Sequence, residues 1–144
     1  MAQAGIQVRG VSELQRFLLN LAPRVKSDIK AITEATGRLI EAKAKQNAPV
    51  DTGKLRQSIV YEPTRGGFGA KVSVNVPYGW YVEFGTGALV NIPDGWGDFA
   101  QSLKGQGKRQ VNLPARPYLI PAFLAHRDLY EKAIRDRLNQ IIGR

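Results

Sequence analysis

The stretch PRVKSDIKAITEATGRLIEAKAKQN, residues 23–47, decides the fold of this chain. Apolar residues and one threonine follow each other in it at steps of four, three, four and three: Val25, Ile29, Ile32, Thr36 and Leu39. This spacing places them on one face of an α-helix. Pro23 suits the first turn of such a helix, and Pro49 ends it because the residue before a proline is pushed out of the helical region. The pattern predicts a helix over 23–47, ~37 Å long.

A shorter helix is expected before it, from Ser12 as N-cap to Leu21. Its apolar face is formed by four residues at helical spacing: Leu14, Phe17, Leu18 and Leu21. Pro23 separates the two helices, because Ala22 precedes a proline and is pushed out of the helical region.

Downstream of the long helix the pattern changes to turns and alternation. Asp51 or Thr52 is expected to cap one short helical turn by accepting from the backbone N–H of Lys54 or Leu55. Three strands are then expected, at 59–62, 72–76 and 80–84, with a Gly- and Pro-containing hairpin loop over 63–69. The third strand is predicted from Trp80, Val82 and Phe84, which alternate with Tyr81 and Glu83. It is expected to end at Gly85-Thr86-Gly87.

Residues 88–111 show no period, and irregular loops of that length in compact domains are generally functional. After Pro114-Ala115-Arg116-Pro117 a last helix is expected. Its apolar stripe is Leu119, Phe123, Tyr130, Ile134, Leu138 and Ile141. The sequence therefore predicts a single α+β domain over 1–144. It consists of a helical part (1–47), a small antiparallel sheet (48–87), a long assembly loop (88–113) and a C-terminal helix (114–144).

Composition narrows the functional classes. The chain has 144 residues, 21 Lys and Arg against 12 Asp and Glu, a net charge of +9, no cysteine and one histidine, His126. Without cysteine there is no disulfide scaffold, thiol nucleophile or Cys-built metal site, and one histidine argues against a His-rich metal centre. No apolar stretch approaches the ~20 residues that span a bilayer. Because residues 1–8 contain no apolar signal core, the chain is expected to stay in the cytoplasm of the cell that makes it.

The positive charge is spread along the chain with one acidic interval. Residues 72–103 contain no base and three acids, Glu83, Asp94 and Asp98. A basic face on one subunit and an acidic face on the next would suit head-to-tail contact between identical subunits. An ordinary solvated surface explains the same distribution equally well.

Catalytic patterns are weak. The stretch from Gly105 to Arg109 lacks the Ser or Thr and the preceding strand of a phosphate-binding loop. His126 lies on the apolar stripe of the last helix and is expected to be packed. Glu83 is expected to be a structural ion-pair partner, for which Arg56 or Arg116 could serve. A carboxylate pair of Asp51 and Glu83 is conceivable, but nothing fixes their separation. The residues make no case for an enzyme, a cofactor or a metal.

Nucleic-acid binding is the alternative that the charge suggests. Lys104, Lys108 and Arg109 could contact phosphates, with Trp96 and Phe99 stacking on bases. The chain contains no helix-turn-helix, zinc-finger or RNP signature. The alternative is therefore a basic module that binds nucleic acid without reading its sequence.

Three stretches taken in order carry a resemblance: APVDTGKLRQSI (48–59), YGWYVEFGT (78–86) and PARPYLIPAF (114–123). Together they resemble the neck and minor-tail proteins of long-tailed bacteriophages, the head-to-tail joining or tail-completion family. The motif residues so identified are Pro49, Asp51, Thr52, Gly53, Leu55, Tyr81, Glu83, Phe84, Gly85, Thr86, Pro114, Arg116 and Pro117. The stretch between the second and third motifs is longer and richer in glycine than the family pattern.

The resemblance implies a structural virion protein without catalytic activity. It implies a ring of six copies at the head–tail junction, with the motif residues serving fold and assembly. The implied partners are the connector or a head-closure protein on one side and the tail terminator or tail tube on the other. Residues Trp96, Phe99, Lys104, Lys108 and Arg109 would then lie at an interface or in the ring lumen, where they could contact passing DNA. The resemblance leaves tail completion, tail termination and head closure open.

Overall fold

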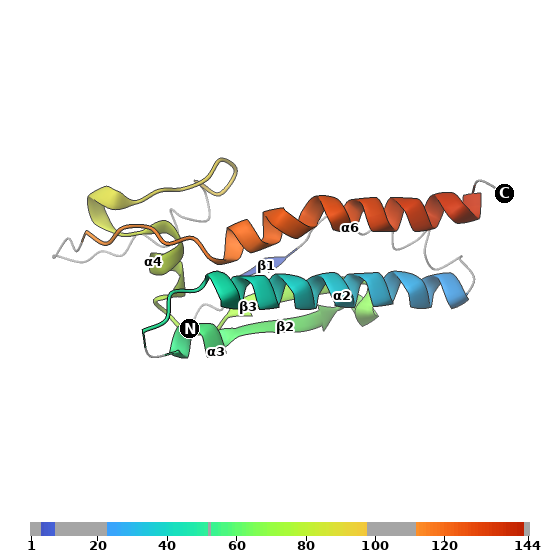
Figure 1. Ribbon diagram of the computed structural model, residues 1–144, viewed down its shortest axis with the longest axis horizontal. Helices are drawn as coiled ribbons and strands as arrows, with labels where there is room; N and C mark the ends of the chain where they lie inside the picture. The colour runs from blue at the N-terminus through green and yellow to red at the C-terminus, as the bar shows by residue number, and fades with distance from the viewer. Residues whose placement is uncertain (1–3, 8–22, 52, 98–111, 143–144) are drawn as a thin grey trace.

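The structure is a computed structural model, and it describes residues 4–7, 23–51, 53–97 and 112–142. The elements in order are β1 (Ala4–Gln7), α2 (Pro23–Asn47), α3 (Lys54–Ser58), β2 (Ile59–Thr64), η1 (Arg65–Gly67), β3 (Gly69–Val74), α4 (Gly79–Phe84), η2 (Gly87–Leu89) and α6 (Leu119–Ile142). The predicted α+β class is confirmed: a small antiparallel sheet packs with a long helix and a C-terminal helix (Figure 1). The helix expected over 12–21 lies outside the described residues.

The sheet has the order β1-β3-β2, and both pairs are antiparallel. Ile59 lies opposite Val74 and Thr64 opposite Gly69, so β2, η1 and β3 form the predicted hairpin. Its boundaries differ from the expectation because Pro63 is still paired within β2, with Ala70. Strand β1, which the sequence did not predict, adds to the free edge of β3 with Ala4 opposite Val74.

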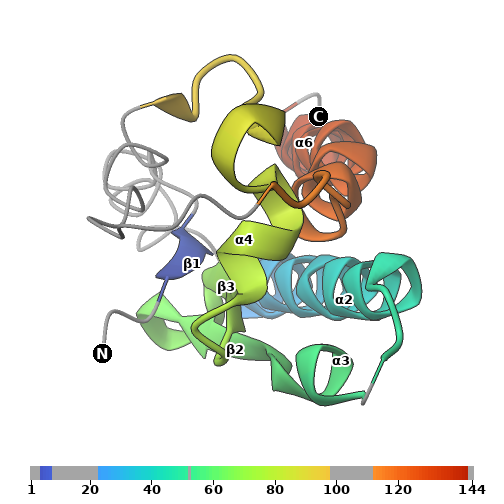
Figure 2. The same cartoon turned by 90° about the vertical axis from the view of Figure 1, so that its left-hand side faces the viewer.

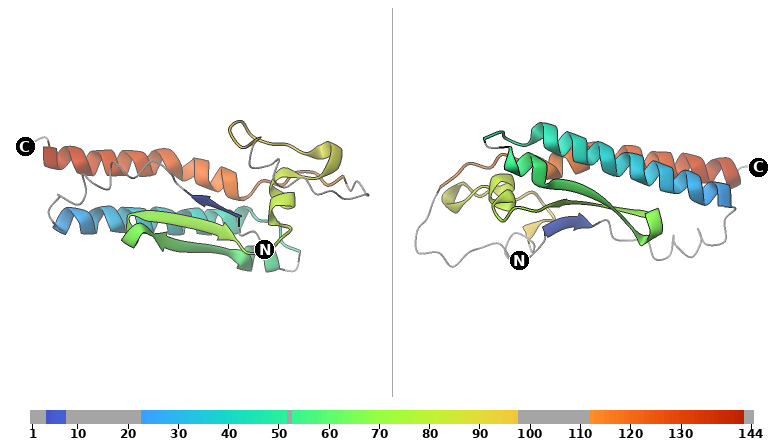
Figure 3. Two further views of the ribbon diagram at one scale, coloured as in Figure 1. Left: turned by 180° about the vertical axis from the view of Figure 1, so that it is seen from behind. Right: turned by 90° about the horizontal axis from the view of Figure 1, so that it is seen from below.

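The two long helices run antiparallel, side by side, and α2 lies between α6 and the sheet (Figures 1 and 2). Their contact is fixed at three points along its length. Arg137 donates to Asp28 at 2.9 and 2.5 Å, the Thr33 and Tyr130 hydroxyls are 3.1 Å apart, and Asn47 Nδ2 donates to the Tyr118 carbonyl at 3.4 Å. Views from behind and below show the same order of layers (Figure 3).

Helix α2 has the predicted bounds, but its buried face differs from the predicted stripe. The buried residues are Val25, Ile29, Thr33, Gly37, Ile40 and Ala44. Thr36 is half-buried and Leu39 is 54% exposed, so the prediction that they belong to the core stripe is wrong. The reason is that α2 packs against α6 and the sheet at once, which rotates its buried face along its length.

The approach of α2 to the sheet depends on Gly37. A Cβ there would collide with the ring of Tyr61 and come within 3.1 Å of the Ala70 Cβ. The guanidinium of Arg38 lies over the same Tyr61 ring, 5.3 Å from its centroid. A search for apolar residues overlooks this contact because glycine contributes no apolar side chain, although it permits the closest packing.

Residues 79–84 form helix α4, so the predicted third strand is wrong. Trp80 and Phe84 stack with ring centroids 5.7 Å apart, and Gly79 and Glu83 are buried beside them. Residues four apart share a side in a strand and also in a helix, so Trp80 and Phe84 fit either structure. The two are distinguished by Glu83, which a strand would turn outward and α4 turns inward.

The core has two parts. The larger cluster lies between the sheet, α4 and the beginning of α6, and it includes Ile59, Val74, Trp80 and Tyr118. The smaller cluster consists of Val25, Ile29 and Ile134 at the other end of the helix pair, with Tyr130, Leu138 and Ile141 partly buried against it. The predicted stripe of α6 therefore faces the interior.

The region predicted as an assembly loop is only partly described. Residues 90–97 have little regular structure, and Ile92 and Trp96 pack partly buried against the larger cluster. Phe99, Lys104, Lys108 and Arg109 lie outside the described residues, as does Asp98. Within the described part of the chain, no helix is long and apolar enough to cross a membrane.

Candidate docking site where three motifs meet

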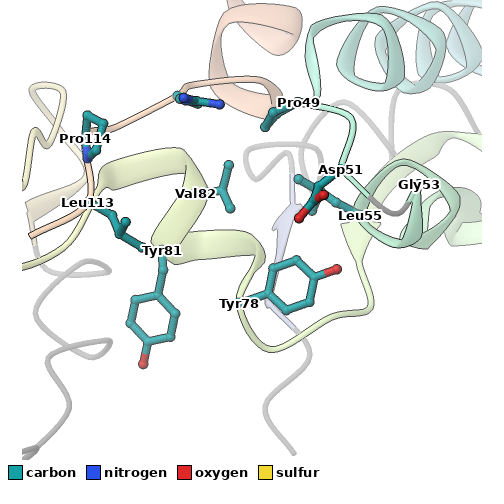
Figure 4. Close-up of a pocket in the computed structure, with 10 residues that line it drawn as sticks. Pro49, Asp51, Gly53, Leu55, Tyr78, Tyr81, Val82, Leu113 and Pro114 are labelled. Atoms are coloured by element: carbon teal, nitrogen blue, oxygen red, sulfur yellow. The ribbon is translucent and has the colours of Figure 1, made fainter. Parts of the chain in front are cut away.

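The three motif stretches, far apart in the sequence, meet around one open hollow with a volume of about 460 Å³ (Figure 4). The lining residues are Pro49, Asp51, Gly53, Leu55, Tyr78, Tyr81, Val82, Leu113, Pro114 and Arg116. The first four come from the segment after α2, the next three from α4 and the residue before it, and the last three from the segment before α6.

The first wall is formed where α2 ends and α3 begins. The backbone N–H of Gln57 donates to the Gly53 carbonyl at 3.0 Å, and Gly53 is the N-cap of α3 with φ of 79°. Of the two predicted caps, Asp51 does not cap this turn, because α3 has no side-chain cap hydrogen bond from the described residues. The alternative cap, Thr52, lies outside the described residues. Asp51 is therefore free to face the hollow.

The second wall is α4, which turns Tyr81 and Val82 outward as it buries Trp80 and Phe84. Tyr78 and Tyr81 are 41% and 42% exposed. Gly85 ends the helix with φ of 78°, and a Cβ there would lie 2.7–2.9 Å from backbone atoms of three other residues. Glycine is required at this position for both reasons.

The third wall is the extended segment 112–118, which the two prolines of the PARP motif favour. It is hydrogen-bonded to α4 and to the residue after Gly85. Thr86 and Leu113 exchange two bonds of 2.9 Å, from the Thr86 N–H to the Leu113 carbonyl and from the Leu113 N–H to the Thr86 hydroxyl. The Arg116 N–H donates to the Val82 carbonyl at 2.7 Å. The long loop thus leaves and rejoins the domain at one fixed point.

Glu83 holds α4 and α6 together beneath the hollow. Its side chain is 1% exposed and accepts three backbone N–H bonds from the start of α6, namely Tyr118 at 2.8 Å, Leu119 at 2.9 Å and Ile120 at 2.9 Å. These N–H groups have no partner within the helix, and the positive end of the helix dipole favours a carboxylate. The expectation of an ion pair with Arg56 or Arg116 is therefore wrong, because backbone N–H groups take that place.

Tyr118 completes this junction. Its hydroxyl donates to the Gly79 carbonyl at 2.9 Å. Burial raises the pKa of the Tyr118 hydroxyl well above its usual value, with the nearby Glu83 charge acting in the same direction. The hydroxyl therefore stays protonated and available as a donor.

This geometry offers no catalytic constellation among the described residues. Glu83 is fully engaged with α6, so it does not form a carboxylate pair with Asp51. His126 is partly buried with Nδ1 2.9 Å from the Ala122 carbonyl, as expected of a packed histidine. No cluster of three metal-ligating side chains occurs in the described part of the chain.

Of the predicted motif residues, Pro49, Asp51, Gly53, Leu55, Tyr81, Pro114 and Arg116 line the hollow. Glu83, Phe84, Gly85 and Thr86 do not line the hollow but hold α4 and the segment 112–118 in place behind it. Sequence reasoning did not assign Tyr78, Val82 or Leu113 to the site. Their positions in the sequence could have indicated them, since each lies within or next to a motif stretch.

Comparison with protein families gives a match over residues 12–85, just over half of the chain, to the HK97-gp10-like family, described as "Bacteriophage HK97-gp10, putative tail-component". The protein is thus a structural component of a bacteriophage tail and not an enzyme. It belongs to the HK97-gp10-like family, which confirms the resemblance carried by the first two motifs. No curated protein and no solved structure matched the chain.

Proposed function

We propose that six copies of this tail component form a ring in the phage neck, where the ring completes the tail or joins it to the head. One face of the ring would meet the connector or a head-closure protein, and the other the tail terminator or the tail tube protein. DNA would pass through the channel and contact basic side chains without sequence recognition.

The observation that carries this proposal is the hollow on a member of a tail-component family. Its walls expose Tyr78, Tyr81 and Leu113, which are large apolar or aromatic side chains. Aromatic side chains in a concave, well-supported site are typical of protein interfaces. Val50, also exposed, lies next to the lining residues Pro49 and Asp51. A second copy or a neighbouring neck protein would remove this surface from water.

The charge distribution supports the same proposal, but without a contribution from Glu83. Of the three acids in the interval 72–103, Glu83 is buried and unavailable to any partner, whereas Asp94 is exposed. No Lys or Arg among the described residues is buried, and a basic surface suits a channel that carries DNA.

Two measurements test the proposal. Native mass spectrometry of the purified chain should give a hexamer, and electron microscopy of particles made without this protein should show filled heads and separate tails. A chain that is monomeric at all concentrations, together with normal joined particles in its absence, would overturn the proposal. Steep salt-dependent binding of short DNA by that monomer would favour the basic nucleic-acid-binding module instead.

A further inference from the structure

We propose that Arg65, at the tip of the β2–β3 hairpin, is the anchor that fills the hollow of a second copy of this chain. This inference rests on the proposed ring and names the contact that would build it. The contact is heterologous, since the hairpin tip of one subunit binds the motif hollow of the next.

The hollow has the chemistry of an arginine site. Asp51 supplies a carboxylate for a charge-assisted bond, and Tyr78 and Tyr81 supply aromatic faces on which a guanidinium stacks. The Asp51 carboxylate points toward the Tyr78 ring on one wall (Figure 4). Arg116 also lines the hollow, and Asp51 is the one carboxylate among the described lining residues. The incoming cation would therefore approach between Asp51 on the first wall and Tyr78 on the second.

The hairpin tip is built to present Arg65. Among the described residues other than glycine, Arg65 alone has a positive φ, 51°. Gly66 and Gly67 follow with φ of 66° and 97°, and the space where a Cβ of Gly66 would lie is open. A non-glycine residue in the left-handed region costs stability and is held where function needs it. The exposed Arg65 therefore projects from a sharp turn that glycine would form with less strain.

The tip lies at the end of the sheet that points away from the hollow, as a head-to-tail contact requires (Figures 1 and 3). The tip packs against the N-terminal part of α2, where Lys30 Nζ lies 4.9 Å from the Phe68 ring centroid. The hollow begins just beyond the C-terminal end of α2.

The charges of the two ends are complementary. The C-terminal end of α2 makes the hollow end negative, and the tip carries Arg65 close to Lys30. The dipole of α6 points the other way, but the Glu83 carboxylate offsets its positive end. The hollow end therefore attracts a cation more than the number of its charged side chains indicates.

Cysteine cross-linking tests the contact directly, because the natural chain contains no cysteine. The variants Asp51→Cys and Arg65→Cys are mixed and oxidised, and mixed disulfides are measured by mass spectrometry. We expect the mixture to give at least tenfold more mixed disulfide than Asp51→Cys with Arg135→Cys. Arg135 is a matched exposed arginine on α6. Equal yields would overturn the contact.

A second variant separates folding from association. Arg65→Gly removes the guanidinium and relieves the positive φ, so it should melt at the wild-type temperature or higher. Its self-association, measured by sedimentation velocity, should weaken at least tenfold, while Arg135→Ala stays within twofold of wild type. Wild-type association of Arg65→Gly would overturn the proposal.

Charge reversal completes the test. Asp51→Arg and Arg65→Asp should each weaken association, and the double variant should restore it; aspartate tolerates the left-handed region that position 65 requires. If the wild-type chain forms a ring but the double variant does not regain association, the Arg65 contact is overturned and the ring proposal stands. A wild-type chain that never associates would overturn both.

Discussion

The two ends of the helix pair are held together by different means. At the motif end, α4, the segment before α6 and the sheet share the larger core cluster, and a buried carboxylate binds three backbone N–H groups. At the far end, α2 and α6 share a small cluster of Val25, Ile29 and Ile134, with a partly buried ion pair between Asp28 and Arg137. The motif end is fixed by directional bonds in a buried setting, whereas the far end depends mainly on side-chain packing.

This difference explains why the hollow lies at the motif end. A docking surface binds well when its walls keep their shape before the partner arrives. The second and third walls of the hollow are joined by the two hydrogen bonds between Thr86 and Leu113 and by the bond from the Arg116 N–H to the Val82 carbonyl. We expect the far end to open locally without disturbing these bonds, because local stability varies within one domain.

The largest expected effect is at Glu83. Glu83→Ala would leave three buried N–H groups without an acceptor, and each such group costs about 1–3 kcal/mol. We expect a loss of roughly 3–5 kcal/mol in the free energy of unfolding, measured by urea denaturation, and a smaller loss for Glu83→Gln, which keeps one acceptor oxygen. Charge reversal at Glu83 should likewise impair folding and not assembly alone.

Glu62→Gln is the matched control for Glu83→Gln, because Glu62 is an exposed carboxylate in β2. It should leave the unfolding free energy within about 0.5 kcal/mol of wild type. If Glu83→Gln and Glu62→Gln were equally stable, the carboxylate would not hold α4 to α6.

An intermediate effect is expected at Ile134 in the smaller cluster. Ile134→Ala deletes buried apolar volume and should cost about 2–4 kcal/mol. Hydrogen exchange should show faster opening of the last turns of α6, while the amides of Leu119 and Ile120 remain protected. Uniformly faster exchange along α6 would mean that the two ends open together.

The smallest effect is expected at Asp94, an exposed acid in the same acidic interval as Glu83. Asp94→Lys should change the unfolding free energy by less than about 0.5 kcal/mol, as surface substitutions usually do. If the exposed acid serves a subunit contact, the variant should still weaken ring formation in native mass spectrometry. A loss of unfolding free energy as large as that of Glu83→Ala would show that burial does not decide how much these acids contribute to stability.

Much of the fold could be predicted from local patterns. Proline placement and 3.6-residue periodicity set the bounds of α2 and the inward stripe of α6, while alternation and glycine placement set the β2–β3 hairpin. The candidate site was partly predictable, because its residues lie in three recognisable stretches. That the stretches enclose one hollow was not, since nothing in their spacing fixes how they meet.

The sequence by itself determined the long helices and the hairpin, because their periodicity extends over enough residues to separate a helix from a strand. Only the tertiary structure decided residues 79–84, where Trp80 and Phe84 suit either conformation. There the outcome depends on Glu83, whose carboxylate reaches the free N–H groups of α6 when the segment is helical. The acceptor and its donors lie 35 to 37 residues apart, and their pairing exists only in the folded chain.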